Sequence, residues 1–295
     1  MRRLFLLSLI ALGGCLMAGA QSSSVISFAV RGGADVYLSS PKAVGVPGPE
    51  GMFDIQYACY FPTRGHAELG FRTGIGVGAT RLSFRDKVAE SFSNTDYLGH
   101  PMDYQVLSDE VRMSVSQFQV EVPLLFTLRA NGFYFDLGLT YRYLIRSRYA
   151  QSISDLSIVA YYPEYDVYVR NELITGQLDA DRYAVSGRGL MPHHHLFCSF
   201  EWGYDWSLSD LSQLGLGLYL NISPWNDYQP KSASSEWLID VGEIVDPSYP
   251  PAEVKSYLLT DVSALQFKAF TFGLRLRYSL TPSPYSSYRR YRYRR

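Results

Sequence analysis

Residues 133–149, FYFDLGLTYRYLIRSRY, alternate between two kinds of side chain. From Phe133 to Ile145 every second residue is apolar or aromatic, whereas the positions between them, Asp136 and Arg142 included, are mostly small or polar. Successive side chains of a β-strand point to opposite faces, so a period of two predicts a strand. The alternation runs well past the roughly 5–6 residues of a typical strand. The sequence therefore predicts a long strand with one apolar and one charged face.

The same alternation recurs in seven other segments, which brings the number of predicted strands to eight. Bulky Leu, Phe and Trp occupy their apolar phases, and their polar phases mix Gly with charged residues. We therefore expect an all-β fold, an antiparallel transmembrane β-barrel of eight strands. The other seven segments are residues 26–38, 53–61, 69–79, 118–128, 196–208, 214–222 and 270–280.

The connections between these segments alternate in length. Three short ones, PTRG, RANG and SDLSQ, carry the Pro, Gly, Asn and Asp that hairpin turns use. Short turns on one side and long loops on the other are typical of outer-membrane barrels, whose short turns face the periplasm. An even number of strands then places both termini in the periplasm. The long connections are residues 39–51, 87–110, 153–189 and 224–262.

The polar phase is expected to face the interior of the barrel. Eight strands leave an interior just wide enough for side chains to fill, and a closed barrel leaves no unpaired backbone edge in lipid. Opposite charges inside would then pair into a network that plugs the lumen, because an unpaired buried charge is costly; a proton or ion path is the alternative. The predicted network comprises Arg31, Asp35, Asp54, Arg72, Glu121, Asp136, Arg142, Glu201, Asp205, Arg275 and Arg277.

Aromatic residues gather where the predicted strands reach the short turns. An interfacial girdle of aromatic side chains is typical of outer-membrane barrels. The six residues are Phe61, Phe126, Phe133, Phe135, Trp206 and Tyr278.

Residues 1–20 have the features of a signal peptide: two arginines, an apolar run, and Ala18-Gly19-Ala20 before Gln21. Cleavage at a lipid-bearing Cys15 is the alternative. The predicted barrel domain is residues 21–280, followed by a basic Tyr/Arg tail at residues 281–295. In the periplasm this tail would meet anionic headgroups or an acidic protein, or serve only as a solubilising end. Its arginines are Arg289, Arg290, Arg292, Arg294 and Arg295.

No pattern in the chain predicts catalysis, a cofactor or a metal. His193, His194 and His195 are consecutive on a strand, so they point to alternating faces and cannot all bind one ion from one side. His100 and Asp103 could meet them above the barrel, but no nucleophile motif is present. Cys59 and Cys198 fall on apolar phases and are expected to be small apolar fillers, with a disulfide between them as the alternative.

The segment from Phe118 to Ile145 resembles small outer-membrane β-barrel proteins of the PorT-like kind, which are common in Bacteroidota. The resemblance lies in Glu121-Val-Pro-Leu-Leu125, the turn glycine Gly132 and the aromatic and glycine residues 134–138. The glycine-spaced strand at residues 70–78 is similar as well. The resemblance implies the barrel fold and, as one function, a component or assembly factor of a protein secretion system. The tail beyond Leu280 departs from that pattern.

These observations favour a non-enzymatic protein of the bacterial outer membrane, a scaffold or surface-binding barrel that acts through its long loops. The segment Ile158 to Val169 has strand-like halves around Pro163 to Asp166, so it is expected to form a hairpin above the membrane, or else two further spanning strands. With ten strands, a small channel becomes a second alternative to the secretion factor. The expected partners are outer-membrane lipid and envelope or secretion-system proteins, and the compartment excludes nucleic acid.

Overall fold

The computed structural model describes residues 23–39, 44–63, 67–95, 99–169, 180–188, 193–224, 239–241, 252–254 and 267–281. The described residues form strands, turns and bends. Among them, no helix is long and apolar enough to cross a membrane.

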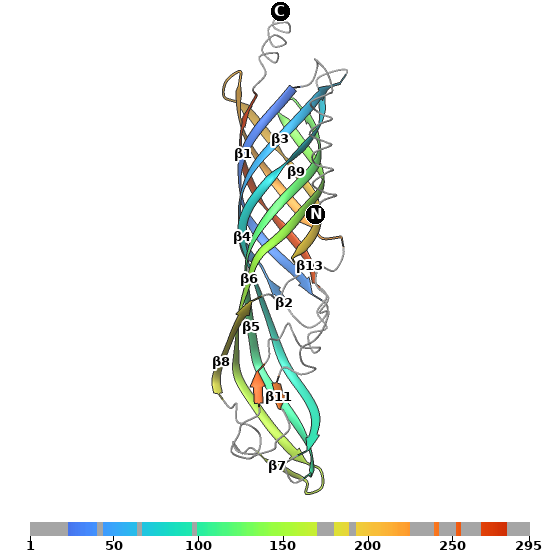
Figure 1. The fold of residues 1–295 in the computed structure, drawn as a ribbon, viewed down its shortest axis with the longest axis vertical. Coiled ribbons are helices and arrows are strands. Elements are labelled where there is room, and N and C mark those ends of the chain that lie inside the picture. The colour runs from blue at the N-terminus through green and yellow to red at the C-terminus, as the bar shows by residue number, and fades with distance from the viewer. Residues whose placement is uncertain are drawn as a thin grey trace, which may run out of the picture.

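Eight antiparallel strands close into a ring (Figure 1). The order around the ring is β1-β3-β4-β5-β6-β9-β10-β13, and β13 pairs with β1 again. Pairing between β4 and β5 completes the closure, so no edge is left in the barrel. The strands are β1 (Ser23–Ser39), β3 (Gly48–Pro62), β4 (Ala67–Thr95), β5 (Pro101–Ala130), β6 (Phe133–Tyr162), β9 (His194–Ser207), β10 (Ser212–Ile222) and β13 (Phe267–Leu280).

These eight strands confirm the eight predicted segments and exclude the ten-stranded alternative. The turn between β5 and β6 is also confirmed, since Asn131 and Gly132 adopt φ of 52° and 88°. Ile26 lies opposite Leu280 and near the tight turns, so both ends of the barrel sequence lie at the turn end.

The prediction of long loops at residues 87–110 and 153–189 was wrong in large part. β4 continues to Thr95, β5 begins at Pro101, and β6 continues to Tyr162, so the three strands project far beyond the ring (Figure 1). Three short strands pair with this projecting sheet: β2 (Val44–Val46) with β4, and β7 (Val167–Val169) and β8 (Ala180–Arg188) with β6. We refer to residues 81–95, 101–117 and 146–162 together with β7 and β8 as the extension.

The hairpin predicted around Pro163 to Asp166 is confirmed, because β7 folds back onto the end of β6 through this turn. It forms the tip of the extension instead of crossing with the barrel strands. Two further strands, β11 (Ile239–Val241) and β12 (Ala252–Val254), form a separate pair.

One face of the extension is buried, and β-bulges keep it on the same side of the long strands. On β6, Leu144 and Ser147 are both buried while Ile145 and Arg146 between them are both exposed, because the register with β5 shifts there. A bulge changes the alternation by one residue. Arg146 and Arg148 lie beyond this shift, and both side chains are exposed. The register between β4 and β5 also shifts, at Asp86 and Val88, and this shift likewise changes the alternation by one residue.

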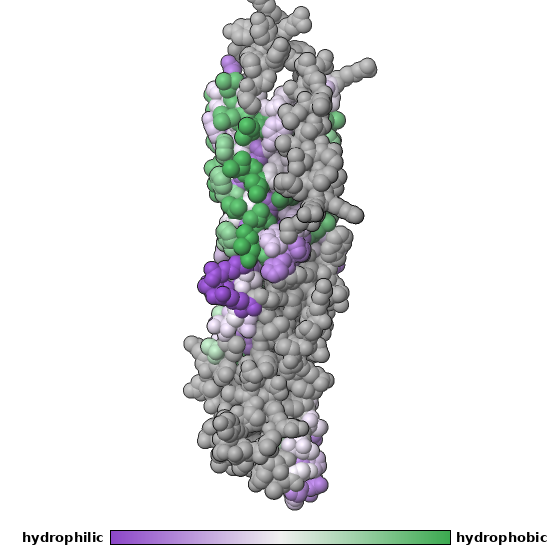
Figure 2. Space-filling model, in the orientation of Figure 1, coloured by the Kyte–Doolittle hydropathy of each residue, from purple (hydrophilic) through white to green (hydrophobic). Residues whose placement is uncertain are grey.

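The barrel exposes its apolar phase to the outside. Figure 2 shows hydrophobic residues gathered into a belt over the ring strands. Five of the six residues of the predicted aromatic girdle are exposed, and Phe61 is partly exposed. Each strand contributes at least one exposed apolar side chain, for example Phe28, Ile55, Phe71, Leu124, Leu137, Trp202, Leu218 and Leu274.

Inward glycines make room for inward tyrosines. A Cβ on Gly217 would lie 2.0 Å from Tyr134 Oη and 2.7 Å from the Trp202 carbonyl oxygen. Gly203 lies opposite Gly217, and its Cβ would meet the same hydroxyl at 2.7 Å. Tyr219 occupies the equivalent place over Gly33. Glycines on the polar phase therefore let the interior close over aromatic rings.

We predict that Gly217→Ala destabilises the barrel by about 1–3 kcal/mol, the usual cost of overpacking a filled interior. The matched control is Gly51→Ala, because a Cβ on Gly51 has no heavy atom within 4 Å. Urea unfolding of both variants in lipid vesicles, followed by tryptophan fluorescence, measures the difference. Equal unfolding midpoints for the two variants would contradict the close packing over Gly217.

Candidate functional site: the charged interior

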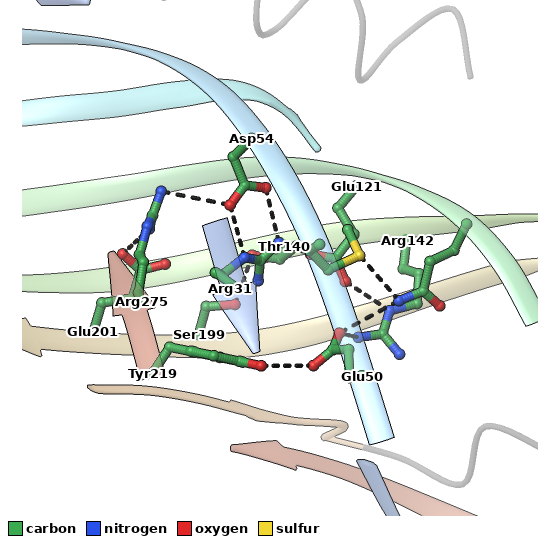
Figure 3. A network of polar contacts seen from close by, with 12 residues as sticks. Arg31, Glu50, Asp54, Glu121, Thr140, Arg142, Ser199, Glu201, Tyr219 and Arg275 are labelled. Atoms are coloured by element: carbon green, nitrogen blue, oxygen red, sulfur yellow. Dashed lines mark hydrogen bonds and ion pairs between the residues drawn. The ribbon is translucent and has the colours of Figure 1, made fainter. Parts of the chain in front are cut away.

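All eleven residues of the predicted network lie inside the barrel. None is more than 6 % exposed. They come from seven of the eight ring strands, and ion pairs bring them together across the lumen (Figure 3). They form two clusters, one toward the extension and one toward the tight turns.

Glu121 is the centre of the cluster toward the extension. Its carboxylate accepts hydrogen bonds from two guanidinium groups, that of Arg31 over 2.5 Å and that of Arg142 over 2.7 Å. Arg31 also holds Asp54 through Nε and Nη2, at 2.8 and 3.0 Å. This forked geometry is the strong form of an arginine–carboxylate pair. β1, β3, β5 and β6 are thereby joined through their side chains as well as their backbones.

Arg142 connects two further carboxylates to the same cluster. Its Nη1 lies 3.1 Å from Asp35 and its Nη2 lies 3.0 Å from Glu50. Hydroxyl groups complete the hydrogen bonding, since Thr271 donates to Asp35 over 2.9 Å and Tyr219 donates to Glu50 over 2.8 Å. Two arginines thus face four carboxylates here.

The second cluster contains as many arginines as carboxylates, three of each. Ion pairs join Arg72 to Asp136 and Arg275 to Glu201. Arg277 holds both oxygens of Asp205, at 2.8 and 2.9 Å. The two clusters are linked where Arg275 approaches Asp54, with 3.7 Å between Nη2 and Oδ2.

Tyrosines separate the charges of the second cluster. The guanidinium of Arg277 lies 4.0 Å from the centroid of the Tyr134 ring, a cation–π contact. Arg72 lies 5.6 Å from the same ring and donates a hydrogen bond to Tyr60 over 3.0 Å. The rings fill space that single charged side chains would leave open.

Four members of the interior were missed by sequence reasoning: Glu50, Arg129, Tyr134 and Tyr219. Glu50 was placed in a long connection, although it continues the inward phase of Met52 and Asp54 on β3. That two-residue spacing was the available signal. The same spacing applies to Tyr134, which shares the phase of Asp136 on β6, and to Tyr219, which shares the phase of Asn221 on β10. Their packing over glycines of other strands is not visible in the sequence. Arg129 lies 3.5 Å from Asp205 across the barrel, which a sequence cannot show.

The histidines do not form one site. His194 is exposed, and its Nδ1 is hydrogen-bonded to the hydroxyl of Tyr141, whereas His195 is buried inside. The alternation of faces is thus as predicted. A meeting of His100 with this triplet is wrong, because His100 lies at the tip of the extension, with Nδ1 3.2 Å from Glu164. In the part of the chain that the structure describes, no group of His, Cys, Asp or Glu has the arrangement of a metal site.

Cys59 and Cys198 are both free thiols, which excludes the disulfide alternative. Their strands, β3 and β9, are not neighbours in the ring. The predicted signal peptide with Cys15 and the five tail arginines lie outside the described residues.

No protein-family model matches the chain, and no curated protein matches it significantly. Solved structures give weak matches. Neisserial surface protein A is 8% identical with a TM-score of 0.24, over 88% of this chain and 98% of that one. The translocator domain of autotransporter NalP from Neisseria meningitidis is 9% identical with a TM-score of 0.22, over 92% of each chain. The outer membrane protease OmpT from Escherichia coli is 8% identical with a TM-score of 0.23, over 90% of this chain and 97% of that one. The assignment of the barrel fold depends on the closed register of its own eight strands.

We predict that Arg142→Ala lowers the stability of the barrel by about 3–5 kcal/mol, because three buried carboxylates each lose one ion-pair partner. Arg142→Met, which retains most of the side-chain bulk, should be destabilised as well if charge is the cause. Arg112→Ala is the control, since Arg112 is exposed and its ion pair among the described residues is with Glu110, outside the barrel interior. Thermal unfolding in detergent, followed by circular dichroism, checks the three variants. A wild-type midpoint for both Arg142 variants would show that the buried ion pairs do not support the fold.

Proposed function

We propose that this chain is a non-enzymatic integral protein of the bacterial outer membrane, in which a plugged barrel anchors a projecting sheet that binds partners. The observation that carries the proposal is the continuity of β4, β5 and β6, which pass without interruption from the barrel into the extension. Anchor and binding surface would then be one rigid piece.

The height of the apolar belt supports a membrane-spanning role. On β6 the outward residues from Phe133 to Tyr143 are apolar or aromatic. Ten residue steps at about 3.3 Å, tilted by about 40°, give roughly 25 Å along the barrel axis, which matches the apolar band of outer-membrane barrels. Exposed Phe133 and Trp206 lie at one limit of this belt and Tyr141 with His194 at the other.

The orientation follows from the two ends of the barrel. Short turns and both ends of the barrel sequence share one end, and the extension occupies the other. In outer-membrane barrels the short turns face the periplasm and the longer segments face outward. We therefore place the tight turns and both termini in the periplasm, and the extension outside the cell.

The filled interior favours an anchor over a small channel. Ion pairs inside the lumen join strands that are not neighbours in both clusters, β1 and β5 through Arg31 and Glu121, and β4 and β6 through Arg72 and Asp136. Eight strands leave no room for an aqueous path beside such side chains. A channel would require these pairs to separate, at the cost of leaving charges buried alone.

The tip of the extension offers side chains suited to contact with a partner. Tyr165 and Tyr168 are 57% and 62% exposed. Tyr168 packs against Tyr161 with ring centroids 4.7 Å apart, and Tyr165 packs against His100 at 5.7 Å, which holds the rings in place. Exposed aromatic rings with polar ends are common in protein interfaces. The partner would be an envelope protein or an external ligand.

The PorT-like resemblance suggests a narrower version of the same role, as a component or assembly factor of a protein secretion system. This narrower version keeps the plugged barrel as the anchor and differs from the general proposal only in the partner that the extension binds. A secretion defect on deletion of the chain would distinguish this version from a self-sufficient surface protein.

We predict that the purified barrel in planar lipid bilayers shows no conductance above the lipid baseline. Arg142→Ala should also stay at baseline, because Arg31 and its carboxylates still occupy the lumen, even though the variant unfolds at lower temperature. Single-channel recording of both proteins provides the measurement. A large rise in conductance for Arg142→Ala without loss of stability would favour a channel.

We predict that Tyr165→Ala/Tyr168→Ala reduces crosslinking to partner proteins in the native outer membrane by roughly tenfold, since loss of two interface aromatics costs at least about 1–2 kcal/mol. The control is Leu208→Ala, an exposed apolar residue at the turn end. The tagged wild type and variants are crosslinked in the membrane and purified. Mass spectrometry then identifies the partner proteins and measures the ratio of each partner to the barrel. An unchanged partner ratio for the tyrosine variant would assign the binding to another surface.

A further inference from the structure

A band of arginines borders the apolar belt on the side of the extension. Along the outward face of β6, Tyr141 and Tyr143 are followed by Ile145 and then by exposed Arg146 and Arg148. Figure 2 shows a strongly hydrophilic cluster directly at the lower limit of the hydrophobic belt on the visible face. The change from apolar to cationic residues therefore occurs within a few residues along the strand.

The strand register arranges part of this band into one row across four strands. Arg81 on β4 lies opposite Ser116 on β5, Ser116 lies opposite Arg148 on β6, and Arg148 lies opposite Arg188 on β8. All four side chains are exposed. We refer to Arg81, Arg148 and Arg188 as the arginine row.

The row brings like charges directly opposite each other. Arg148 and Arg188 are partners on adjacent antiparallel strands, a position in which like charges destabilise a sheet. Within the described residues, no carboxylate forms an ion pair with any of the three arginines of the row. An anion from outside the chain would offset this repulsion.

A second pair of facing arginines shows how the chain itself supplies such an anion. Arg85 and Arg112 also lie opposite each other, four residues farther along β4 and β5. Here Glu110 approaches both, at 3.9 Å from Arg85 and 2.6 Å from Arg112. The hydrogen bond from Arg112 lowers the pKa of the Glu110 carboxyl, which keeps it ionised. The arginine row has no counterpart of Glu110 among the described residues.

The arginine row and the pair of Arg85 with Arg112 differ in their distance from the apolar belt. Ser116 lies two residues beyond exposed Phe118, which places the row about 7 Å farther along the strand. The polar headgroup layer is about 5–8 Å thick on each side of the hydrocarbon core. The row is thus at headgroup depth, whereas Arg85 and Arg112, four residues farther along β4 and β5, extend past it.

We propose that the arginine row binds the phosphate groups of an anionic outer-leaflet lipid, of the phosphorylated glycolipid (lipid A) class. The proposal rests on the proposed function, since it requires a barrel inserted up to Tyr143. A lipid is favoured over a free phosphate because the row lies on an open sheet face beside the belt, where acyl chains would pack against Phe118 and Ile145. Arginine recognises phosphate through paired N–H donors, and the exposed side chains of Arg148 and Arg188 suit one such group between them.

The test compares lipid A binding to the full-length, detergent-solubilised protein and to two variants with equal loss of charge. Arg148→Gln/Arg188→Gln removes the pair at headgroup depth, and Arg85→Gln/Arg112→Gln removes the pair that Glu110 neutralises. Each basic residue near an anionic surface contributes about fivefold in affinity, so the first variant should bind lipid A roughly 25-fold more weakly. The second variant should bind almost as the wild type does. Native mass spectrometry with increasing lipid A measures both.

Further measurements identify the chemistry of the ligand and check that the variants fold. Arg148→Lys/Arg188→Lys should recover most of the affinity, and circular dichroism should show intact barrels in all variants. Dephosphorylated lipid A should bind weakly to the wild type. Inorganic phosphate should not compete at concentrations far above those of lipid A.

Several outcomes would overturn the proposal. These are equal binding of dephosphorylated lipid A, equal weakening in both glutamine variants, and competition by inorganic phosphate, which would indicate a site for a free anion. Insertion into phosphatidylcholine vesicles tests the proposed function separately, because such vesicles carry no net charge. Failure to insert would reject the membrane anchor, whereas insertion without preference for lipid A would reject only the role of the arginine row.

Discussion

Closure of eight strands is the constraint on which the other features of this molecule depend. A ring of this size encloses only enough space for side chains, so every inward position must fit its neighbours across the lumen. Ionised groups in that space need partners, because an isolated buried charge is costly. The result is an interior in which Glu121 holds Arg31 and Arg142, and Arg277 lies over Tyr134, with glycines beneath the rings. The same closure leaves the apolar phase on the outside.

The ion pairs are better understood as determinants of one arrangement than as a large net source of stability. Desolvation of two charges offsets most of their attraction, but a shift of one residue in register would place each charge on the opposite face. Pairs such as Arg31 with Glu121 and Arg72 with Asp136 join strands that are not neighbours in the ring. They therefore favour the native register over its alternatives. The apolar belt cannot discriminate as finely, since hydrophobic contact is not directional.

Long strands let one element serve two environments. On β6, the barrel segment has a charged interior and an apolar exterior, whereas the extension has a buried face that includes Gln151 and Ile153 and an exposed face with Arg146 and Arg148. The bulge at Ile145 marks the change, and it lies where the proposed membrane ends. A continuous strand transmits orientation rigidly, so partners at Tyr165 would be held at a defined height above the barrel. The arginine row at the junction would add contacts that keep this height constant.

The sequence by itself determined the number of barrel strands, their two phases and the eleven inward charges, because period-two alternation is a local property of each strand. It also indicated the turn at Asn131 and Gly132, since a tight turn depends on adjacent residues. Only the tertiary structure decided which charge meets which, as the partners Arg31 and Glu121 are ninety residues apart. The outward position of Arg148 also became clear only there. The long strands extend into regions that the sequence indicated as loops. A bulge interrupts the alternation by which a strand is recognised in the sequence, and whether a bulge forms depends on the neighbouring strand.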